Sequence, residues 1–156
     1  MTIDGGAYRT GAAPFSLATG DLDGDDRPDI VVANFESNDV SVLLQHPHIP
    51  GRFFGSGFLD AGDGPLSVAI GDLNQDGRPD VTVANHYGDN VSVHSQIECT
   101  GIGFADPYFL TAGDGPASVA VADLNGDTRL DIAVANYDSG DATLLIRSRV
   151  GKNRRW

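Results

Sequence analysis

A nine-residue acidic segment occurs three times in the chain, beginning at Asp21, Asp72 and Asp123, with an unchanged period of 51 residues. The first copy reads Asp-Leu-Asp-Gly-Asp-Asp-Arg-Pro-Asp, and the other two keep most of its acidic pattern. A fixed period of this length is typical of a repeat protein, in which each unit buries its apolar face against its neighbours. The chain is therefore expected to fold as a row of three similar units.

Each segment carries oxygen-bearing side chains at its first, third, fifth and ninth positions. Alternate side chains of a tight loop can point inward together, and a hard cation makes such a convergence of carboxylates favourable. Calcium fits better than magnesium, because it accepts irregular cages of about six to eight oxygens. A plainer explanation is that Asp, Asn and Gly form turns in which their side chains cap their own backbone. Three loops in register, each with a further acid at the ninth position, favour calcium, with up to three ions per chain.

The sixth position of such a turn often needs a left-handed backbone conformation, which glycine adopts most easily. The second segment has Gly77 there, whereas the first has Asp26 and the third has Thr128. A β-branched residue is a poor candidate for positive φ. We therefore expect the third loop to hold its ion more weakly or in a different shape.

Short apolar segments rich in β-branched residues surround every loop and predict strands. No segment shows a sustained apolar spacing of three and four, so essentially no helix is expected. The predicted strands fall in four sets: 15–19, 66–70 and 117–121; 29–34, 80–85 and 131–136; 40–45, 91–96 and 142–147; and 58–61 and 109–112, with Ala7 to Thr10 in the equivalent place before the first repeat.

Four short antiparallel strands in a unit of about 50 residues match the size of a β-propeller blade. We therefore predict an all-β fold, a β-propeller built of four-stranded antiparallel blades, with each acidic loop joining the first strand to the second. A β-solenoid is the main alternative, but its repeats are usually much shorter. The blades are expected at about 7–57, 58–108 and 109–147, with an N-terminal strand that closes a blade, and the basic segment 148–156 as a flexible tail.

The chain resembles the FG-GAP/VCBS repeats, which build calcium-binding propellers such as the head of integrin α subunits. The likeness runs from about Ala7 to Arg147. The signature survives as Phe54-Gly55 and as Gly11-Ala-Ala-Pro14, while residues 62–65 and 113–116 read Gly-Asp-Gly-Pro. The resemblance implies that the loop side chains are calcium ligands and that the seventh residue of each loop contributes a backbone carbonyl. The implied ligands are Asp21, Asp23, Asp25, Arg27 and Asp29; Asp72, Asn74, Asp76, Arg78 and Asp80; and Asp123, Asn125, Asp127, Arg129 and Asp131.

Three blades are too few for a closed propeller, which typically has about four to eight. An open stack would expose apolar blade faces that are prone to associate. We therefore expect a homo-oligomer that closes a ring, with a dimer of three-bladed chains favoured, or completion by the remainder of a longer propeller. In the dimer, the N-terminal segment would supply the fourth strand that the C-terminal repeat lacks.

A ring recurs beside an asparagine after the second predicted strand of every repeat, on the side of the blades away from the acidic loops. Stacking rings next to amide groups is the chemistry of carbohydrate recognition. The alternative is that the asparagine caps a turn while the ring covers the edge of the next blade. The candidate ligand-binding residues are Asn34, Phe35, Asn85, His86, Tyr87, Asn136 and Tyr137.

Composition narrows the functional classes. A formal net charge of −12 argues against nucleic acid as a partner, and no run of about 18 apolar residues could insert into a membrane. Carboxylates that hold calcium stay ionised and occupied, so we expect no catalytic residues. The resemblance implies a calcium-stabilised recognition or adhesion module for glycans or proteins, located extracellularly, at the cell surface or in the periplasm, although no signal peptide is visible. The alternative is a structural scaffold, or a fragment of a larger propeller appended to a polysaccharide-processing lyase or hydrolase.

Overall fold

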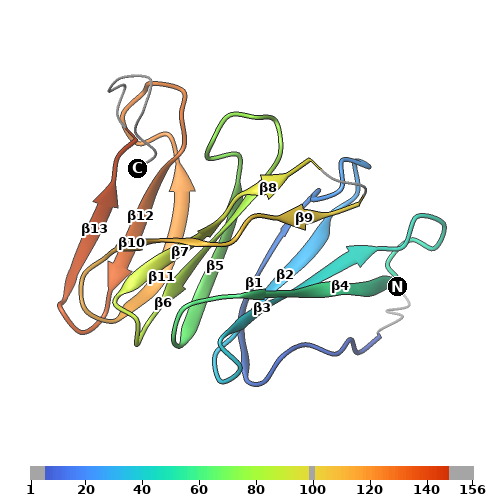
Figure 1. Ribbon diagram of the computed structural model, residues 1–156, viewed down its shortest axis with the longest axis horizontal. Helices are drawn as coiled ribbons and strands as arrows, with labels where there is room; N and C mark the ends of the chain where they lie inside the picture. Colours follow the sequence, from blue (N-terminus) through green and yellow to red (C-terminus); the bar gives the residue numbers. More distant parts are fainter. Residues whose placement is uncertain (1–5, 99–100, 148–156) are drawn as a thin grey trace, which may run out of the picture.

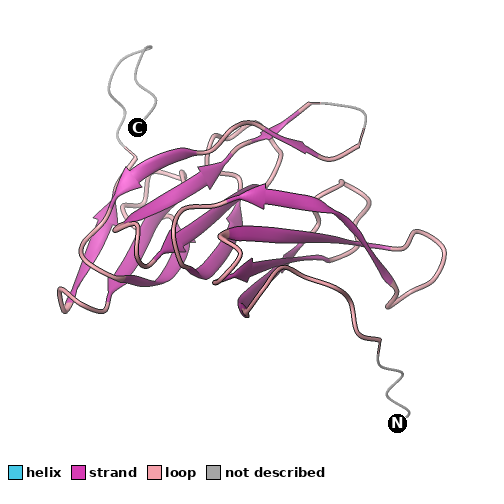
Figure 2. Ribbon diagram, turned by 60° about the horizontal axis from the view of Figure 1, so that its bottom comes forward, coloured by secondary structure: helices cyan, strands magenta, loops and turns pink. Residues whose placement is uncertain are grey.

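Every regular element is a β-strand in the computed structural model, which describes residues 6–98 and 101–147 (Figure 2). These residues form no helix, which confirms the all-β prediction. Residues 6–98 and 101–147 thus include no helix that is long and apolar enough to cross a membrane. The predicted tail at 148–156 lies outside the described residues.

The strands form three antiparallel sheets that stand side by side in chain order (Figure 1). We call these sheets blades 1, 2 and 3, and a separate hairpin of β8 (Gln96–Ile97) and β9 (Gly103–Phe104) extends from blade 2. Blade 1 contains β1 (Pro14–Gly20), β2 (Asp29–Asn34), β3 (Asp39–Gln45) and β4 (Phe53–Asp60); blade 2 contains β5 (Pro65–Gly71), β6 (Asp80–Asn85), β7 (Asn90–His94) and β10 (Tyr108–Thr111); blade 3 contains β11 (Pro116–Ala122), β12 (Asp131–Asn136) and β13 (Asp141–Leu145).

The first strand of each blade begins with a proline and the same irregularity. In blade 1 the pairing passes from Pro14 opposite Asn34 to Ser16 opposite Ala33, so one residue is left over, and the same shift occurs in the other two blades. Proline has no N–H to donate to the ladder, and strand ends and bulges accommodate it well. The repeat in sequence is therefore also a repeat in strand register.

The hydrophobic core lies between the blades. One cluster joins blade 1 to blade 2 and includes Leu22 and Val42 from the first and Val68 and Val83 from the second. A second cluster joins blade 2 to blade 3 in the same way. We call the side of a blade that faces the next blade in chain order its trailing face, and the opposite side its leading face. Each blade is thus stabilised by its neighbours more than by its own interior.

The innermost strands approach one another closely. β5 contacts both β1 and β11, and a side chain at Gly71 would come within 2.7 Å of Leu130 and 2.9 Å of Val121. Glycine at the end of β5 therefore permits this contact, since no larger residue fits without movement of blade 3.

Three strand predictions need correction. Residues 7–10 form no strand in the structure and belong to none of its sheets. Tyr8 instead packs edge-on against Phe53, and the Phe53 N–H donates to its hydroxyl at 3.2 Å. The strand predicted at 91–96 ends at His94, and the chain then turns into the β8–β9 hairpin. The strand predicted at 142–147 likewise ends early, at Leu145.

Candidate metal loops and turn face

The three acidic segments connect the first strand of each blade to the second, as predicted, and lie along the upper side of the molecule in Figure 1. The turns that join the second strand to the third lie along the opposite side (Figure 1). The two groups of candidate residues are therefore at opposite ends of the strands.

The ninth-position aspartates, Asp29, Asp80 and Asp131, are completely buried. The Leu22 N–H donates to Asp29 Oδ2 and the Gln45 N–H to Asp29 Oδ1, both at 2.8 Å. The equivalent bonds to Asp80 and Asp131 join each loop to the N–H groups of Gln96 and Arg147, which lie just beyond the third strand of the blade. Burial raises the pKa of Asp80 above its usual value, and the hydrogen bonds from these N–H groups offset only part of that rise. This carboxylate is therefore a structural link between loop and sheet, whether or not a cation is present.

The first-position aspartates organise the rest of each loop. Asp123 accepts hydrogen bonds from the N–H groups of Gly126, Asp127 and Thr128 at 2.7 to 3.1 Å. These N–H groups, led by that of Thr128, hold the pKa of Asp123 below its usual range. Asp21 and Asp72 accept equivalent bonds in their own loops. Side-chain capping of turns, the plainer explanation of the sequence pattern, is thus present in all three loops.

All three sixth positions have positive φ, at 63° for Asp26, 84° for Gly77 and 69° for Thr128. The predicted conformation is therefore confirmed, and Thr128 adopts it despite its branched side chain. The fourth positions have positive φ as well, including 62° at Gln75. Sequence reasoning missed this second requirement, although glycine at two of the three fourth positions was a usable signal.

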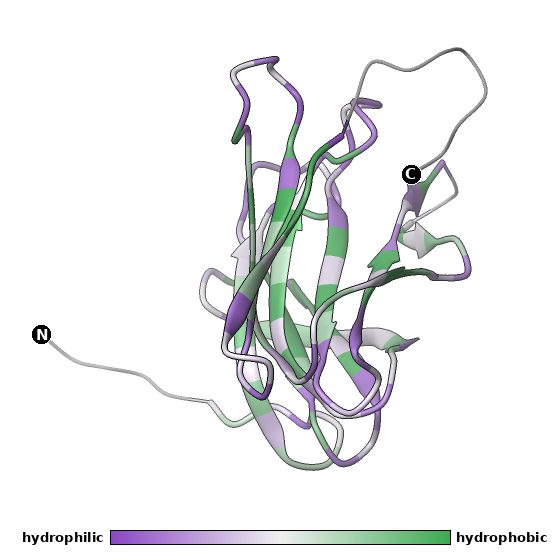
Figure 3. Cartoon of the chain, turned by 90° about the vertical axis from the view of Figure 1, so that its left-hand side faces the viewer, coloured by the Kyte–Doolittle hydropathy of each residue, from purple (hydrophilic) through white to green (hydrophobic). Residues whose placement is uncertain are grey.

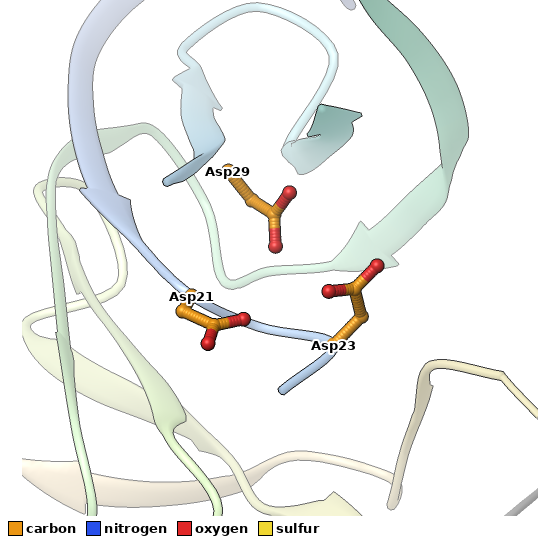
Figure 4. Close-up of side chains that lie close together, drawn as sticks. All are labelled: Asp21, Asp23 and Asp29. Carbon is orange, nitrogen blue, oxygen red and sulfur yellow. The ribbon is translucent and has the colours of Figure 1, made fainter. Parts of the chain in front are cut away.

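The carboxylates converge most clearly in the first loop (Figure 4). Asp21, Asp23 and Asp29 each offer an oxygen within 4.8 Å of the others. Burial raises the pKa of Asp23, and the nearby charges of Asp29 and Asp21 raise it further. Three carboxylates in this arrangement repel one another unless a cation or protons neutralise them.

The fifth-position aspartates face the arginines at the seventh position. Asp76 Oδ2 lies 2.6 Å from Arg78 Nη2, and Asp25 and Asp127 form the same ion pair with their own arginines. The hydrogen bond from Arg129 is the largest of the effects that lower the pKa of Asp127. The oxygen ligands that calcium prefers are therefore best arranged around Asp21, Asp23 and Asp29. The aspartate at the fifth position could bind the ion only after its ion pair with the arginine is broken.

Comparison with known families agrees with this geometry. The FG-GAP-like repeat family matches residues 21–83, which include the first two acidic loops, and the FG-GAP repeat family matches residues 115–146, which include the third. The chain contains FG-GAP repeats. No curated protein matches the chain significantly.

Each FG-GAP repeat buries the asparagine that was predicted to contact a ligand. Asn34, Asn85 and Asn136 end the second strands, and their amide groups donate to the residue five positions later, at 2.6 to 2.8 Å. They also pack against the glycine that precedes the first strand of their own blade, since a side chain at Gly62 would lie 2.6 Å from Asn85 Nδ2. These asparagines lock the turn, so the recognition surface proposed below leaves them out.

The rings of the FG-GAP repeats are more accessible. Tyr87 is 64% exposed and its ring centroid lies 5.4 Å from that of Phe35 and 5.0 Å from that of His86. Tyr137 is 78% exposed. Phe35 lies near the Gly64 turn of blade 2, and His86 lies near the Gly115 turn of blade 3, where its Nε2 is 3.7 Å from Asp138 Oδ2. Phe35 and His86 therefore bridge neighbouring blades, whereas Tyr87 and Tyr137 present their rings to solvent.

Proposed function

We propose that this chain is a non-catalytic extracellular recognition or adhesion module whose blades are stabilised by calcium. FG-GAP repeats are typical of extracellular proteins and often bind calcium, which supports this assignment. The observation that carries it is the convergence of Asp21, Asp23 and Asp29 in the first loop.

In this proposal, calcium supplies the positive charge that neutralises the three converging carboxylates of the first loop, because Arg27 is already paired with Asp25. The ion would bind the oxygens of Asp21 and Asp23 and the buried Asp29, which is anchored to the sheet by backbone N–H groups. Because the unfolded chain cannot hold the ion in this geometry, the binding free energy adds to the stability of the fold.

Thermal unfolding in calcium and in EDTA tests the metal. A site at one hundred times its Kd adds about 2.7 kcal/mol, so we expect the melting temperature to rise by several degrees per occupied site. Asp23→Asn is a matched variant, since Asn74 and Asn125 stand at the same position in the other loops. It should weaken only the first site in a calorimetric titration. Unchanged melting of the wild-type chain after chelation would contradict the calcium proposal.

The recognition surface that we propose centres on Tyr87, supported by the rings of Phe35 and His86. An exposed ring beside acidic groups such as Asp138 can stack on a sugar while its neighbours accept hydroxyl hydrogen bonds. Glycans are therefore the favoured ligands. On a glycan array, Tyr87→Ala should lose binding while its melting temperature stays unchanged. Ile49→Ala, which removes another exposed side chain away from this surface, serves as the control.

A structural scaffold is the second candidate, and one observation favours it. Phe35 and His86 each pack on the turn of the following blade, which is a stabilising role that needs no ligand. The scaffold hypothesis predicts no binding by wild-type protein on the same array. It also predicts that Phe35→Ala lowers stability, whereas Tyr87→Ala changes neither property.

A further inference from the structure

We propose that a second copy of this chain docks against the first, so that the trailing face of blade 3 meets the leading face of blade 1 in the other copy. In the same contact, residues 7–10 of the second copy add a fourth strand to β13. This inference concerns assembly and does not depend on calcium or on a glycan ligand.

The contact proposed here already occurs twice within the chain, at the blade 1–blade 2 and blade 2–blade 3 junctions. Because the three repeats share one register, the residues of a third such junction can be read from their repeat positions. The two faces that would form it belong to opposite ends of the row of blades in Figure 1.

The trailing face of blade 3 keeps the apolar side chains of a junction but packs against no other blade in the described part of the chain. Leu22 and Leu73 are each 1% exposed beneath the following blade, whereas Leu124 at the same repeat position is 46% exposed. Leu144 likewise stands where Val42 and Val93 are buried. Figure 3 looks onto this side and shows hydrophobic residues along the strands, with hydrophilic residues gathered toward their ends.

The leading face of blade 1 shows the complementary pattern. Leu17 is 61% exposed, whereas Val68 and Val119 at the same repeat position are 6% and 7% exposed beneath the preceding blade. Phe15, next to it on β1, is also exposed. Thus each of the two unpartnered faces presents the half of a junction that the other lacks.

The strand edges match as well. β3 is covered by β4 in blade 1 and β7 by β10 in blade 2, but β13 has no outer partner among the described strands. Residues 7–10 precede blade 1 at the repeat position that β4 and β10 occupy before blades 2 and 3. An unpaired edge next to an apolar face is a ready site for strand addition.

The register of that added strand follows from the other two blades. Leu59 pairs with Val40 and Leu110 with Val91, so Tyr8 of the second copy would pair with Ala142. Arg9 would then lie opposite Asp141, where blade 1 has Asp60 opposite Asp39 and blade 2 has Thr111 opposite Asn90. This pairing of opposite charges is specific to the proposed junction, and it favours a second copy over another apolar partner.

Hydrogen bonds across the internal junctions can also continue. The Gln96 amide donates to the Leu22 carbonyl at 2.6 Å, and the Arg147 guanidinium donates to the Leu73 carbonyl. By the same repeat positions, Gln45 of the second copy would donate to the Leu124 carbonyl. One link does not continue, because Gly140 replaces Asn38 and Asp89, whose side chains accept from the Gly64 and Gly115 N–H groups.

Two copies are the stoichiometry that closes. Each copy has one leading and one trailing free face, so a two-fold pair forms the same junction twice and leaves no face exposed. Its six blades fall within the range of about four to eight that closed propellers use, whereas three copies would exceed it.

Light scattering on the purified chain at micromolar concentration tests the stoichiometry. We expect a mass twice the 16.3 kDa of one chain. Leu124→Asp and Leu17→Asp should each halve that mass, and an unchanged strand signal in circular dichroism should show that the monomer remains folded. A wild-type monomer, or aggregates that grow with concentration, would overturn the proposal.

A disulfide between copies tests the register. In a Cys99→Ser background, Tyr8→Cys combined with Ala142→Cys should give a covalent dimer on mild oxidation, because directly opposite residues have Cβ atoms about 4.5 to 5.5 Å apart. Tyr8→Cys with Thr143→Cys is the control, since a shift by one residue places the second thiol on the other face of the sheet. Equal cross-linking of both pairs, or of neither, would overturn the proposed strand pairing.

Discussion

Leu73 in blade 2 and Leu124 in blade 3 occupy the same repeat position, yet the first is 1% and the second 46% exposed. Both follow an aspartate that begins an acidic loop, and both belong to loops with the same hydrogen-bonded frame. Leu73 differs in that another blade packs against it. The apolar side chains at this repeat position are therefore buried by the neighbouring blade and not by their own blade.

The same difference extends to the turn face. His86 of blade 2 lies against the Gly115 turn of blade 3, while Tyr137 of blade 3 is exposed and no blade follows it among residues 6–98 and 101–147. Exposure of Tyr137 is therefore a consequence of its terminal position in the row, and it is weaker support for ligand binding than exposure of Tyr87. Predictions that compare matched positions in blades 2 and 3 can separate these roles.

The largest expected difference concerns the two leucines themselves. Leu73→Ala should lower the free energy of unfolding by about 2–5 kcal/mol, because it leaves a cavity between two blades. Leu124→Ala should change it by less than about 0.5 kcal/mol in dilute, monomeric protein. Urea unfolding followed by circular dichroism measures both. Equal losses for the two variants at high dilution would refute the idea that burial of this position comes from the next blade.

His94 gives blade 2 a pH dependence that blade 3, with Leu145 at the same repeat position, lacks. Burial lowers the pKa of His94 from 6.5 to about 4, so the folded chain keeps it neutral while the unfolded chain binds a proton below pH 6.5. Stability present above pH 6.5 should therefore be lost progressively as the pH falls toward 4, by up to about 3 kcal/mol.

His94→Leu isolates this effect, since it copies Leu43 and Leu145. The wild-type and variant unfolding free energies should diverge as the pH falls from 6.5 to 4 and run parallel above that range. Parallel curves throughout would show that folding does not shift the pKa of His94, and would contradict this prediction. Because the aspartates titrate in both proteins, only the difference between the curves reports on His94.

The repeat made much of the fold predictable. The second strands of all three blades have the predicted boundaries, and the acidic loops connect the predicted strands, because the same local pattern was available three times. The segments without such a pattern were not predictable. Residues 46–57 and 97–108 are equivalent in the 51-residue repeat, yet they fold differently. In blade 1 the segment leads into a long β4, whereas in blade 2 it includes strands of the β8–β9 hairpin.

The sites were less predictable for a different reason. A pattern shows which environment a residue suits, and it does not show whether a neighbour is present to provide it. Leu124 and residues 7–10 read in the sequence like their counterparts, yet one is exposed and the other is not a strand. The burial of Asn34 depends on Asp39 and Ser41, two polar residues of the next strand that accept from its amide.

A smaller difference is expected for the serines of the innermost strands. Ser67 Oγ accepts a hydrogen bond from the Val119 N–H of blade 3 at 3.2 Å, whereas Ser118 at the same repeat position is exposed. Ser67→Ala should cost about 1 kcal/mol by leaving that N–H without its acceptor, and Ser118→Ala should be neutral in the monomer. Chemical denaturation resolves both values, and a loss at Ser118 that appears only at dimer-forming concentrations would link it to the proposed junction.

The smallest effect is expected at the sixth loop position, where blade 2 has Gly77 and blade 3 has Thr128, both with positive φ. A left-handed conformation costs a non-glycine residue about 1–2 kcal/mol, but glycine also loses more chain entropy on folding, by about 0.5–1 kcal/mol. Thr128→Gly should therefore stabilise the chain by only about 0.5 kcal/mol, whereas Gly77→Thr should destabilise it. A calcium titration of the same variants separates backbone strain from metal binding: if strain weakens the third site, Thr128→Gly should strengthen binding there alone, and an unchanged affinity would mean that the threonine is strained with or without the ion.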